Sequence, residues 1–310
     1  MEDQDACSGD SLAAVKSTRP LIVGEVLFDQ FSNGTRVLGG APFNVAWNLQ
    51  GLGLAPLMLT AVGDDKQGQE VRDRMSSWGM DLAALQTAES SPTGQVQVAI
   101  EDGEPSYEIL DRQAYDEIQY PATSISAEEF ALLYVGSLAF RRETTRSTMR
   151  RLMAEAGLPR FVDINIRDPW FEADWAPELL QDAQWTKLNQ HELASIAGAD
   201  CENADQVAAA VDLVRAKYGG RCYLITCGSS GAYACDADGG CMFVAAPSPE
   251  PMIDAVGAGD AFAAAAIFGV IGNWPLEKTL RAAVRFASRA CTIQGATTTD
   301  QEHYQALEAY

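Results

Sequence analysis

The chain of 310 residues has few basic side chains and little histidine. Its 43 aspartates and glutamates outnumber its 22 lysines and arginines, which gives a net charge of −21, and it contains only two histidines. This charge would repel a polyanion, so we expect binding neither to nucleic acid nor to a membrane surface. A neutral substrate is easier to accommodate than an anionic one, which would need a local cationic patch.

Long apolar segments and targeting signals are also lacking. The longest apolar run, residues 261–271, is too short to span a bilayer. Residues 1–18 are polar and acidic, without the basic start and apolar core of a signal peptide. We therefore expect a cytoplasmic protein with a flexible N-terminal tail over residues 1–19.

Several cofactor-binding motifs are absent. None of the seven cysteines forms a Cys-x-x-Cys pair, and both histidines lie far from Cys222 and Cys227. A zinc site is therefore not expected, and the thiols are predicted to be scattered and reduced. The sequence has no Gly-x-x-x-x-Gly-Lys-Ser/Thr P-loop, no Gly-x-Gly-x-x-Gly after the first expected strand, no protein-kinase motifs and no serine nucleophile elbow.

Strand-like apolar runs alternate with segments of helical period through most of the chain. Such alternation predicts an α/β fold with a mostly parallel central sheet and helices on both faces. Residues 29–39, with the hairpin signal Asn33-Gly34, and residues 93–111 are extended and half polar. We expect these two stretches to form a small antiparallel β lid on a single domain over residues 20–310. The expected strands are 21–28, 56–62, 132–135, 161–164, 183–188 and 222–226, and the expected helices are 41–52, 67–78, 144–156 and 204–218.

The most informative segment is the one in which Gly257, Ala258, Gly259 and Asp260 lead into an apolar run. It predicts a buried helix whose first-turn amides are free to bind an anion. An aspartate there would repel a passively bound phosphate. It fits a base that takes a proton from a hydroxyl while the amides hold a transferring phosphoryl group. Taken alone, the segment is explained better as an acidic N-cap on a buried helix.

A second glycine pair, Gly39-Gly40, precedes Asn44 by a few residues. Adjacent glycines let the backbone approach a ligand closely, and Asn44 in the first turn of the next helix offers a donor and an acceptor. Asp29, at the end of the first expected strand, can accept hydrogen bonds from two hydroxyls, so the cluster suits a neutral polyol. The alternative is a Gly-Gly turn followed by a helix with an early proline and an asparagine cap.

Residues 163–167 follow another expected strand, at the edge of the sheet where ligands of open α/β folds collect. If the strand continues to alternate, Asp163, Asn165 and Arg167 share one face. Arg167 could then stabilise phosphoryl charge or hold the substrate. Its alternative role is a pair with a surface acid.

Two further clusters follow strands. Glu192, three residues after Asn189, could hold Mg²⁺ through water, or it could be an ordinary acid at a helix start. The glycine turn 226–231 suits a nucleotide phosphate, although alone it favours a plain hairpin.

Taken together, these segments resemble the ribokinase-like (PfkB) carbohydrate kinase family over roughly residues 20–300. Residues 254–262, Asp-Ala-Val-Gly-Ala-Gly-Asp-Ala-Phe, look like its C-terminal signature, and Gly39-Gly40-Ala41 with Asn44 looks like its N-terminal one. Within the family, the chain looks most like bacterial fructokinases in residues 24–29, 38–46 and 163–167. The other motifs occur in the family's order, namely residues 62–65 with Gly68, Asn189 with Glu192, and Thr226 with Gly228 and Gly231.

The resemblance implies an ATP-dependent sugar kinase with Asp260 as the base and the amides of residues 257–259 as an anion hole. Family members often bind K⁺ beside the anion hole, which here implies the loop of Asp254 and Val256. Ser288 departs from the family, because relatives often have asparagine near this point of the adenine-side helix. The implied contacts are Asp29, Gly39, Gly40 and Asn44 for the sugar, Asn189 and Glu192 for metal and phosphates, and Thr226, Gly228 and Gly231 for the nucleotide.

The leading interpretation is a kinase that uses ATP and Mg²⁺ to convert fructose to fructose 6-phosphate. Kinases of 2-keto-3-deoxygluconate or of a nucleoside remain alternatives, as does a non-catalytic sugar-binding relative. A sugar acid would need a cation, which Arg167 or Arg112 could supply. The polar-apolar pattern of the lid suggests that it pairs with the lid of a second subunit in a homodimer.

Overall fold

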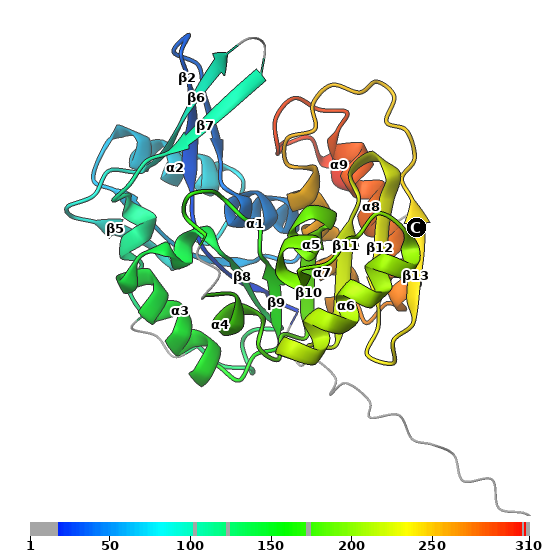
Figure 1. Ribbon diagram of the computed structural model, residues 1–310. Coiled ribbons are helices and arrows are strands. Elements are labelled where there is room, and N and C mark those ends of the chain that lie inside the picture. The colour runs from blue at the N-terminus through cyan, green and yellow to red at the C-terminus, as the bar shows by residue number, and fades with distance from the viewer. Residues whose placement is uncertain (1–17, 102–103, 122–124, 172–174, 306, 308–310) are drawn as a thin grey trace, which may run out of the picture.

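A central β-sheet organises the molecule (Figure 1). The computed structural model describes residues 18–101, 104–121, 125–171, 175–305 and 307, so nearly all of the predicted tail lies outside the described residues. Within these ranges nine strands form the sheet in the order β13-β12-β11-β10-β9-β8-β1-β4-β5. Neighbours from β5 to β11 are parallel, and β12 and β13 add an antiparallel edge. The strands are β1 (Leu21–Val23), β4 (Leu57–Gly63), β5 (Leu85–Ala88), β8 (Leu133–Gly136), β9 (Arg160–Asp163), β10 (Trp185–Asn189), β11 (Cys222–Thr226), β12 (Gly231–Cys235) and β13 (Cys241–Ala245).

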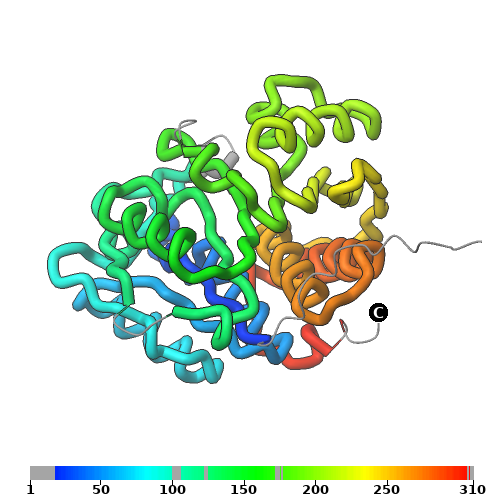
Figure 2. Tube along the Cα trace, turned by 90° about the horizontal axis from the view of Figure 1, so that it is seen from below, coloured from blue at the N-terminus to red at the C-terminus, as the bar shows by residue number. Residues whose placement is uncertain are grey.

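Helices cover both faces of this sheet, as Figure 2 shows along its edge. Successive side chains of a strand point to opposite faces, and the core is accordingly divided in two: Leu21 and Val23 belong to one buried cluster and Ile22 to the other. This arrangement confirms the predicted α/β class. One face carries α3 (Glu143–Glu155), α4 (Ala176–Leu180), α5 (Gln190–Ala197) and α6 (Ala204–Tyr218), and the other carries α1 (Ala41–Gly51), α2 (Lys66–Ser77), α7 (Ala258–Ile271) and α8 (Leu276–Ala290). Short helices are η1 (Ala114–Glu117), η2 (Leu138–Arg141), η4 (Gly228–Ser230) and α9 (Gln301–Gln305).

A second, four-stranded sheet projects from the central one (Figure 1). Its order is β3-β2-β6-β7, and its strands are β2 (Leu27–Phe31), β3 (Arg36–Gly39), β6 (Gly94–Glu101) and β7 (Glu104–Ile109). We call it the lid sheet. It is built from the two predicted lid segments, of which residues 102–103 lie outside the described residues. The expectation of a wholly antiparallel lid is wrong, because the two antiparallel hairpins are joined by parallel pairing of β2 with β6.

The expected first strand, residues 21–28, is divided between the two sheets. β1 ends at Val23 in the central sheet, and β2 begins at Leu27 in the lid sheet. Gly24 between them has a φ of 153°, and a Cβ there would lie 2.3 Å from Cγ of Pro42. The chain leaves the central sheet where only glycine fits against the start of α1. Asp29 is consequently a residue of the lid sheet.

The prediction that all the thiols are reduced is wrong for one pair. Cys235 and Cys241 form a disulfide, and they are register partners in the antiparallel pair of β12 and β13. The hairpin places the two side chains opposite each other, which sequence spacing alone did not reveal. Free thiols are found at Cys201, Cys222, Cys227 and Cys291.

Candidate active site

Gly257 determines the backbone conformation at the N-terminus of α7. This residue caps the helix with a φ of 78°, and a Cβ on it would lie 2.4 Å from Cβ of Ala296. Among the described residues, no acceptor faces the amides of Gly259 and Asp260, whereas the amide of Ala258 donates to the carbonyl of Ala255 at 3.3 Å. Since the rest of α7 is buried among apolar side chains, the helix presents two unpaired amides and its positive dipole end together.

Asp260 itself lies in this first turn and is half-buried. Its Oδ2 accepts a hydrogen bond of 2.8 Å from Nδ2 of Asn44, and the carboxylate makes no ion pair within the described part of the chain. Burial raises the pKa of Asp260 to about 6, although the Asn44 hydrogen bond opposes this shift. The side chain is thus oriented, ionised at neutral pH and close enough to neutrality to accept a proton.

Asn44 links this helix to the lid sheet. It is 5% exposed, and its Oδ1 is buried without a hydrogen-bond partner. A Cβ on Gly39 would lie 3.8 Å from that Oδ1 and 3.8 Å from Oδ2 of Asp29, so the three residues face one another. Asn44 does not cap α1, whose N-cap is Gly40. The alternative of an asparagine cap therefore does not describe this helix.

The acceptor atoms in this corner need donors. Burial raises the pKa of Asp29 to about 6, and the positive charge of Arg167 partly offsets this. The unpartnered Oδ1 of Asn44 adds an acceptor that water or a ligand must satisfy. Sugar hydroxyls are donors of the required kind.

Arg167 does not share a strand face with Asp163 and Asn165. β9 ends at Asp163, and Asn165 has a φ of 44°, so the alternation expected over 163–167 stops there. The side chain of Arg167 is exposed and has no hydrogen bond or ion pair within the described residues. Burial raises the pKa of Glu25, Asp29 and Asp260, and the positive charge of Arg167 partly offsets this rise in each of them. It is therefore an uncommitted cation next to three acids.

Glu192 and Asn189 form a reciprocal cap on α5. Oδ1 of Asn189 accepts from the Glu192 amide at 2.9 Å, and Oε2 of Glu192 accepts from the Asn189 amide at 2.7 Å. Oε1 of Glu192 accepts from the amide of Ile166 at 2.8 Å, which ties α5 to the loop of Arg167. Both carboxylate oxygens are thus engaged, so a metal here would be reached through water rather than by chelation.

Three of the predicted nucleotide residues lie at or after the end of β11, the neighbour of β10, and Thr226 is the register partner of Asn189. Thr226 ends β11, and Gly228 (φ 55°) and Gly231 (φ 133°) shape the turn into β12. A Cβ on Gly231 would lie 2.0 Å from the carbonyl oxygen of Val244. Packing is therefore sufficient to explain the glycine at this position, without a bound nucleotide. Ser288 is half-buried on α8, which packs against β12 and β13.

The loop before α7 is folded around Asp254. Its Oδ1 accepts from the amide of Val256 and its Oδ2 from the amide of Gly295, both at 3.0 Å. The backbone carbonyls of Asp254 and Val256 accept no backbone hydrogen bond among the described residues. These carbonyl oxygens are ligands of the type that K⁺ prefers.

Two buried charged groups were missed by the sequence reasoning. Glu25 is 4% exposed with its Oε2 unpartnered, and burial raises its pKa to about 7. Lys187 is 6% exposed, and its Nζ lies 2.9 and 2.8 Å from the two carboxylate oxygens of Asp163. The available signal was a charged residue inside an apolar run that is typical of a strand. Buried strands rarely contain a charged side chain unless it is paired.

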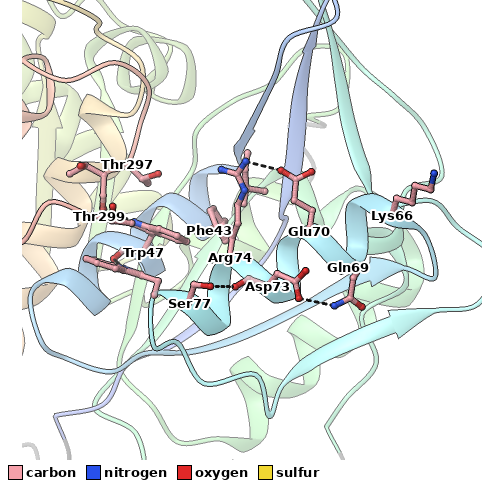
Figure 3. Close-up of a pocket in the computed structure, with 13 residues that line it drawn as sticks. Phe43, Trp47, Lys66, Gln69, Glu70, Asp73, Arg74, Ser77, Thr297 and Thr299 are labelled. Atoms are coloured by element: carbon pink, nitrogen blue, oxygen red, sulfur yellow. Dashed lines mark hydrogen bonds and ion pairs between the residues drawn. The ribbon is translucent and has the colours of Figure 1, made fainter.

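A groove of about 710 Å³ is lined by other residues (Figure 3). It is bounded by α1, α2 and residues 297–299, and none of the predicted site residues lines it. Several of its polar groups interact with each other: Arg74 pairs with Glu70 at 2.7 Å, and Gln69 donates to Asp73 at 2.8 Å.

Within the described residues, no helix is both long and apolar enough to cross a membrane. No cluster of three or more His, Cys, Asp or Glu side chains that could hold a metal ion occurs there either.

Comparison with known proteins gives a consistent answer. Residues 10–303 match the pfkB family of carbohydrate kinases. Fructokinase from Klebsiella pneumoniae is 28% identical over 297 residues, which cover 89% of this chain and 94% of that protein. Aminoimidazole riboside kinase from Salmonella enterica, solved with aminoimidazole riboside and an ATP analogue, has a TM-score of 0.77 at 22% identity, covering 94% and 99% of the two chains. A double mutant of fructokinase from Vibrio cholerae O395, bound to fructose, ADP and potassium, has a TM-score of 0.75 at 22% identity, covering 96% and 99%. The family match and these likenesses confirm the resemblance and the fold expected from the sequence.

Proposed function

The chain belongs to the pfkB family of carbohydrate kinases and is a phosphotransferase with an alcohol as acceptor, and from this premise we propose that it phosphorylates a neutral sugar. The best-supported reaction is transfer of the γ-phosphoryl group of ATP to fructose, giving fructose 6-phosphate. The observation that carries the proposal is the Asp260 carboxylate, held by Asn44 beside the unpaired amides of Gly259 and Asp260.

The charge balance of the site supports a neutral acceptor. Asp29, Asp260 and Glu25 supply three carboxylates, and Oδ1 of Asn44 supplies another acceptor. Arg167 and Lys187 are cations that act on Asp260, and Arg167 is the exposed one of the two. A sugar acid would bring a further negative charge among these groups, whereas a polyol brings the donors that they lack.

Each residue then has a defined role in the reaction. Asp29, Asn44 and the backbone at Gly39 and Gly40 orient the sugar. Asp260 accepts the proton of the attacking hydroxyl. The first-turn amides of α7 stabilise charge on the phosphoryl oxygens, and Arg167 adds a mobile positive charge. Positioning and such preorganised dipoles supply most of the rate enhancement in phosphoryl transfer.

The proposed cations have donors suited to them. Asn189 and Glu192 would hold Mg²⁺ through water, because both oxygens of Glu192 already accept amides. When bound, Mg²⁺ neutralises phosphate charge. The carbonyls of Asp254 and Val256, which accept no backbone hydrogen bond in the described chain, are the proposed K⁺ ligands. Thr226, Gly228, Gly231 and Ser288 are the proposed nucleotide contacts.

The proposal extends to location and assembly. Use of ATP fits a cytoplasmic enzyme. Pairing of two copies through the lid sheet is supported by Tyr107 on its edge strand β7, which is 56% exposed. Sedimentation velocity of the wild type and of Tyr107→Glu tests this, since a lid-mediated dimer is weakened by the added charge and a monomer is unaffected.

Sugar-dependent release of ADP tests the function. We expect turnover with fructose to exceed turnover with 2-keto-3-deoxygluconate and with adenosine. Faster turnover of 2-keto-3-deoxygluconate would reassign Arg167 to a substrate carboxylate. Faster turnover of adenosine would place the chain with the aminoimidazole riboside kinase instead. Absence of turnover with all three, despite sugar binding, would favour the non-catalytic alternative.

A further inference from the structure

Basic side chains gather on one side of α8, in a chain that has few of them. Only 22 of the 310 residues are lysine or arginine. Helix α8 nevertheless carries one acid, Glu277, and four basic residues, Lys278, Arg281, Arg285 and Arg289. Their spacing of three or four residues places them along one side of the helix, where like charges repel one another. The cluster therefore opposes the stability of α8.

The first three of these cations line a cavity of about 320 Å³ at the start of α8, together with Pro275 and Glu277. Sites for small molecules have volumes from roughly 300 Å³ upward. The carboxylate of Glu277 pairs with Arg281 at 2.7 Å. Nζ of Lys278 lies 4.2 Å from the ring centroid of Trp274 and has no acidic partner among the described residues. Cations are thus in excess over acids around the cavity.

The dipoles of the two helices that meet here do not account for these cations. Lys278 lies in the first turn of α8, at the positive end of its dipole, where a cation is unfavourable. A cation would be favourable at the nearby C-terminus of α7. There, however, the carbonyls of residues 268–270 already accept hydrogen bonds from the backbone amides of residues 272–274. Neither helix end needs a basic side chain at this place.

Close packing fixes the cavity relative to α7. Gly269 of α7 faces Thr279 of α8, and a Cβ on Gly269 would lie 2.7 Å from Oγ1 of Thr279. The first turns of α8 are therefore held against the end of α7. Asp260 lies in the first turn of α7, at the other end of this 14-residue helix, which is about 20 Å long. The cavity is thus separate from the candidate active site.

We propose that the cavity at the start of α8 binds a small phosphate-bearing anion. The guanidinium groups of Arg281 and Arg285 offer pairs of N–H donors that match the geometry of phosphate oxygens, and Lys278 adds a third positive charge. The occupant is a small molecule, because the net charge of −21 would repel an extended polyanion or an anionic membrane. The inference does not depend on the proposed kinase function.

The test uses inorganic pyrophosphate as the probe. Its binding is followed by the fluorescence of Trp274, because Lys278 lies over the indole ring. We expect a saturable change in the wild type. In the triple variant Lys278→Gln/Arg281→Gln/Arg285→Gln, the dissociation constant should rise at least about tenfold, since charge-assisted hydrogen bonds are lost. An equal dissociation constant in the two proteins would overturn the proposal.

A matched variant separates this cavity from the effect of net charge. Arg151→Gln/Lys217→Gln/Arg221→Gln removes three exposed cations elsewhere and changes the net charge by the same amount. We expect the dissociation constant for pyrophosphate to stay within about threefold of the wild-type value, because exposed charges act weakly at a distance. If both triple variants bind pyrophosphate equally weakly, general electrostatic attraction explains the binding and the proposal is wrong.

Two single variants keep the test decisive if the triple variant fails to fold. Lys278→Gln breaks no ion pair within the described residues, and we expect it to raise the dissociation constant at least about threefold. Trp274→Phe should abolish the fluorescence change while the heat of binding persists in calorimetry. A fluorescence change that survives Trp274→Phe would place the anion elsewhere and contradict the proposal. None of these measurements requires turnover, so failure of the kinase function would leave them unchanged.

Discussion

Two residues from opposite ends of the chain, Asn44 and Asp260, meet in a hydrogen bond of 2.8 Å. That bond engages Oδ2 of Asp260, so Oδ1 is available for the proton of a substrate hydroxyl. Desolvation brings the pKa of this carboxyl to about 6, and a base with a pKa just below the working pH combines ionisation with proton affinity. The residue chemistry therefore suits proton abstraction near neutrality.

This pKa predicts the pH dependence of the reaction. Asp260 must be ionised to act as a base, so kcat/KM should fall as the pH drops below about 6. Asp29 has a pKa of about 6 as well, so its protonation should make the fall of kcat/KM at acidic pH steeper. Activity measured across the pH range from about 5 to 8 checks this. A rate that stays constant down to pH 4.5 would show that neither group titrates as described.

Removal of the Asn44 side-chain amide should shift the acidic limb of the pH profile, which is the range in which kcat/KM falls as the pH decreases. Its hydrogen bond lowers the pKa of Asp260, so Asn44→Ala raises this pKa and shifts the acidic limb to higher pH. Gln30→Ala, a half-exposed residue of the lid strand β2, serves as a control that should leave the limb in place. If both variants keep the wild-type midpoint, the hydrogen bond does not tune the base.

The charge on Asp260 should also carry a cost in stability. Its folded pKa lies above the ordinary value of 3.8, so the folded state binds the proton more tightly than the unfolded state does. Folding is thus favoured as the pH falls below about 6, and ionisation at neutral pH opposes folding. We expect Asp260→Asn to have a higher melting temperature than wild type at pH 7.5, in calorimetry. A lower melting temperature would mean that the carboxylate is stabilising.

At the scale of the element, the N-termini of α7 and α1 provide both halves of the candidate site. The sequence allowed these helices and their glycine-rich starts to be predicted, because Gly257 and Gly39-Gly40 stand directly before long apolar runs. It did not allow the path of the chain between them to be predicted. The break at Gly24 depends on contact with Pro42, and the parallel pairing of β2 with β6 depends on segments about 60 residues apart. Such long-range contacts leave little local signal.

Glycine at the start of α7 provides a prediction for this element. Both Gly257 (φ 78°) and Gly53 (φ 84°) adopt left-handed backbone, but a Cβ would collide with Ala296 only at the former. Gly53→Ala should cost about 1–2 kcal/mol of unfolding free energy for the backbone alone. Gly257→Ala should cost at least about 1 kcal/mol more, because the overlap forces a shift. Urea unfolding measures both, and equal costs would show that the α7 start is not tightly packed.

At the scale of the whole molecule, the alternation of strands and helices was sufficient to predict the layered fold. The buried pair of Asp163 and Lys187 could not be predicted, because it requires the register of β9 against β10. The disulfide of Cys235 and Cys241 was missed because it depends on the β12–β13 hairpin, whose two strands were not among those expected. The sequence analysis thus missed the register between strands, and it also missed the strands β5, β12 and β13 themselves.

The net charge of −21 predicts that salt stabilises the protein. Self-repulsion opposes the compact state, and raising ionic strength from about 0.05 to 0.5 M shortens the Debye length to a few Å. The melting temperature should therefore rise in both NaCl and KCl, and further in KCl if the Asp254 loop binds K⁺. Turnover should rise specifically in KCl if the Asp254 loop binds K⁺. A melting temperature that does not change with salt would mean that the acids are already balanced locally.

The most direct test of Asp260 as the base is the turnover of Asp260→Asn with fructose and ATP. The change keeps the shape of the side chain and its contact with Asn44 but removes the proton acceptor. We predict that kcat falls at least about 10²-fold while the dissociation constant for the sugar changes by no more than a few-fold. Turnover close to that of the wild type would contradict the account.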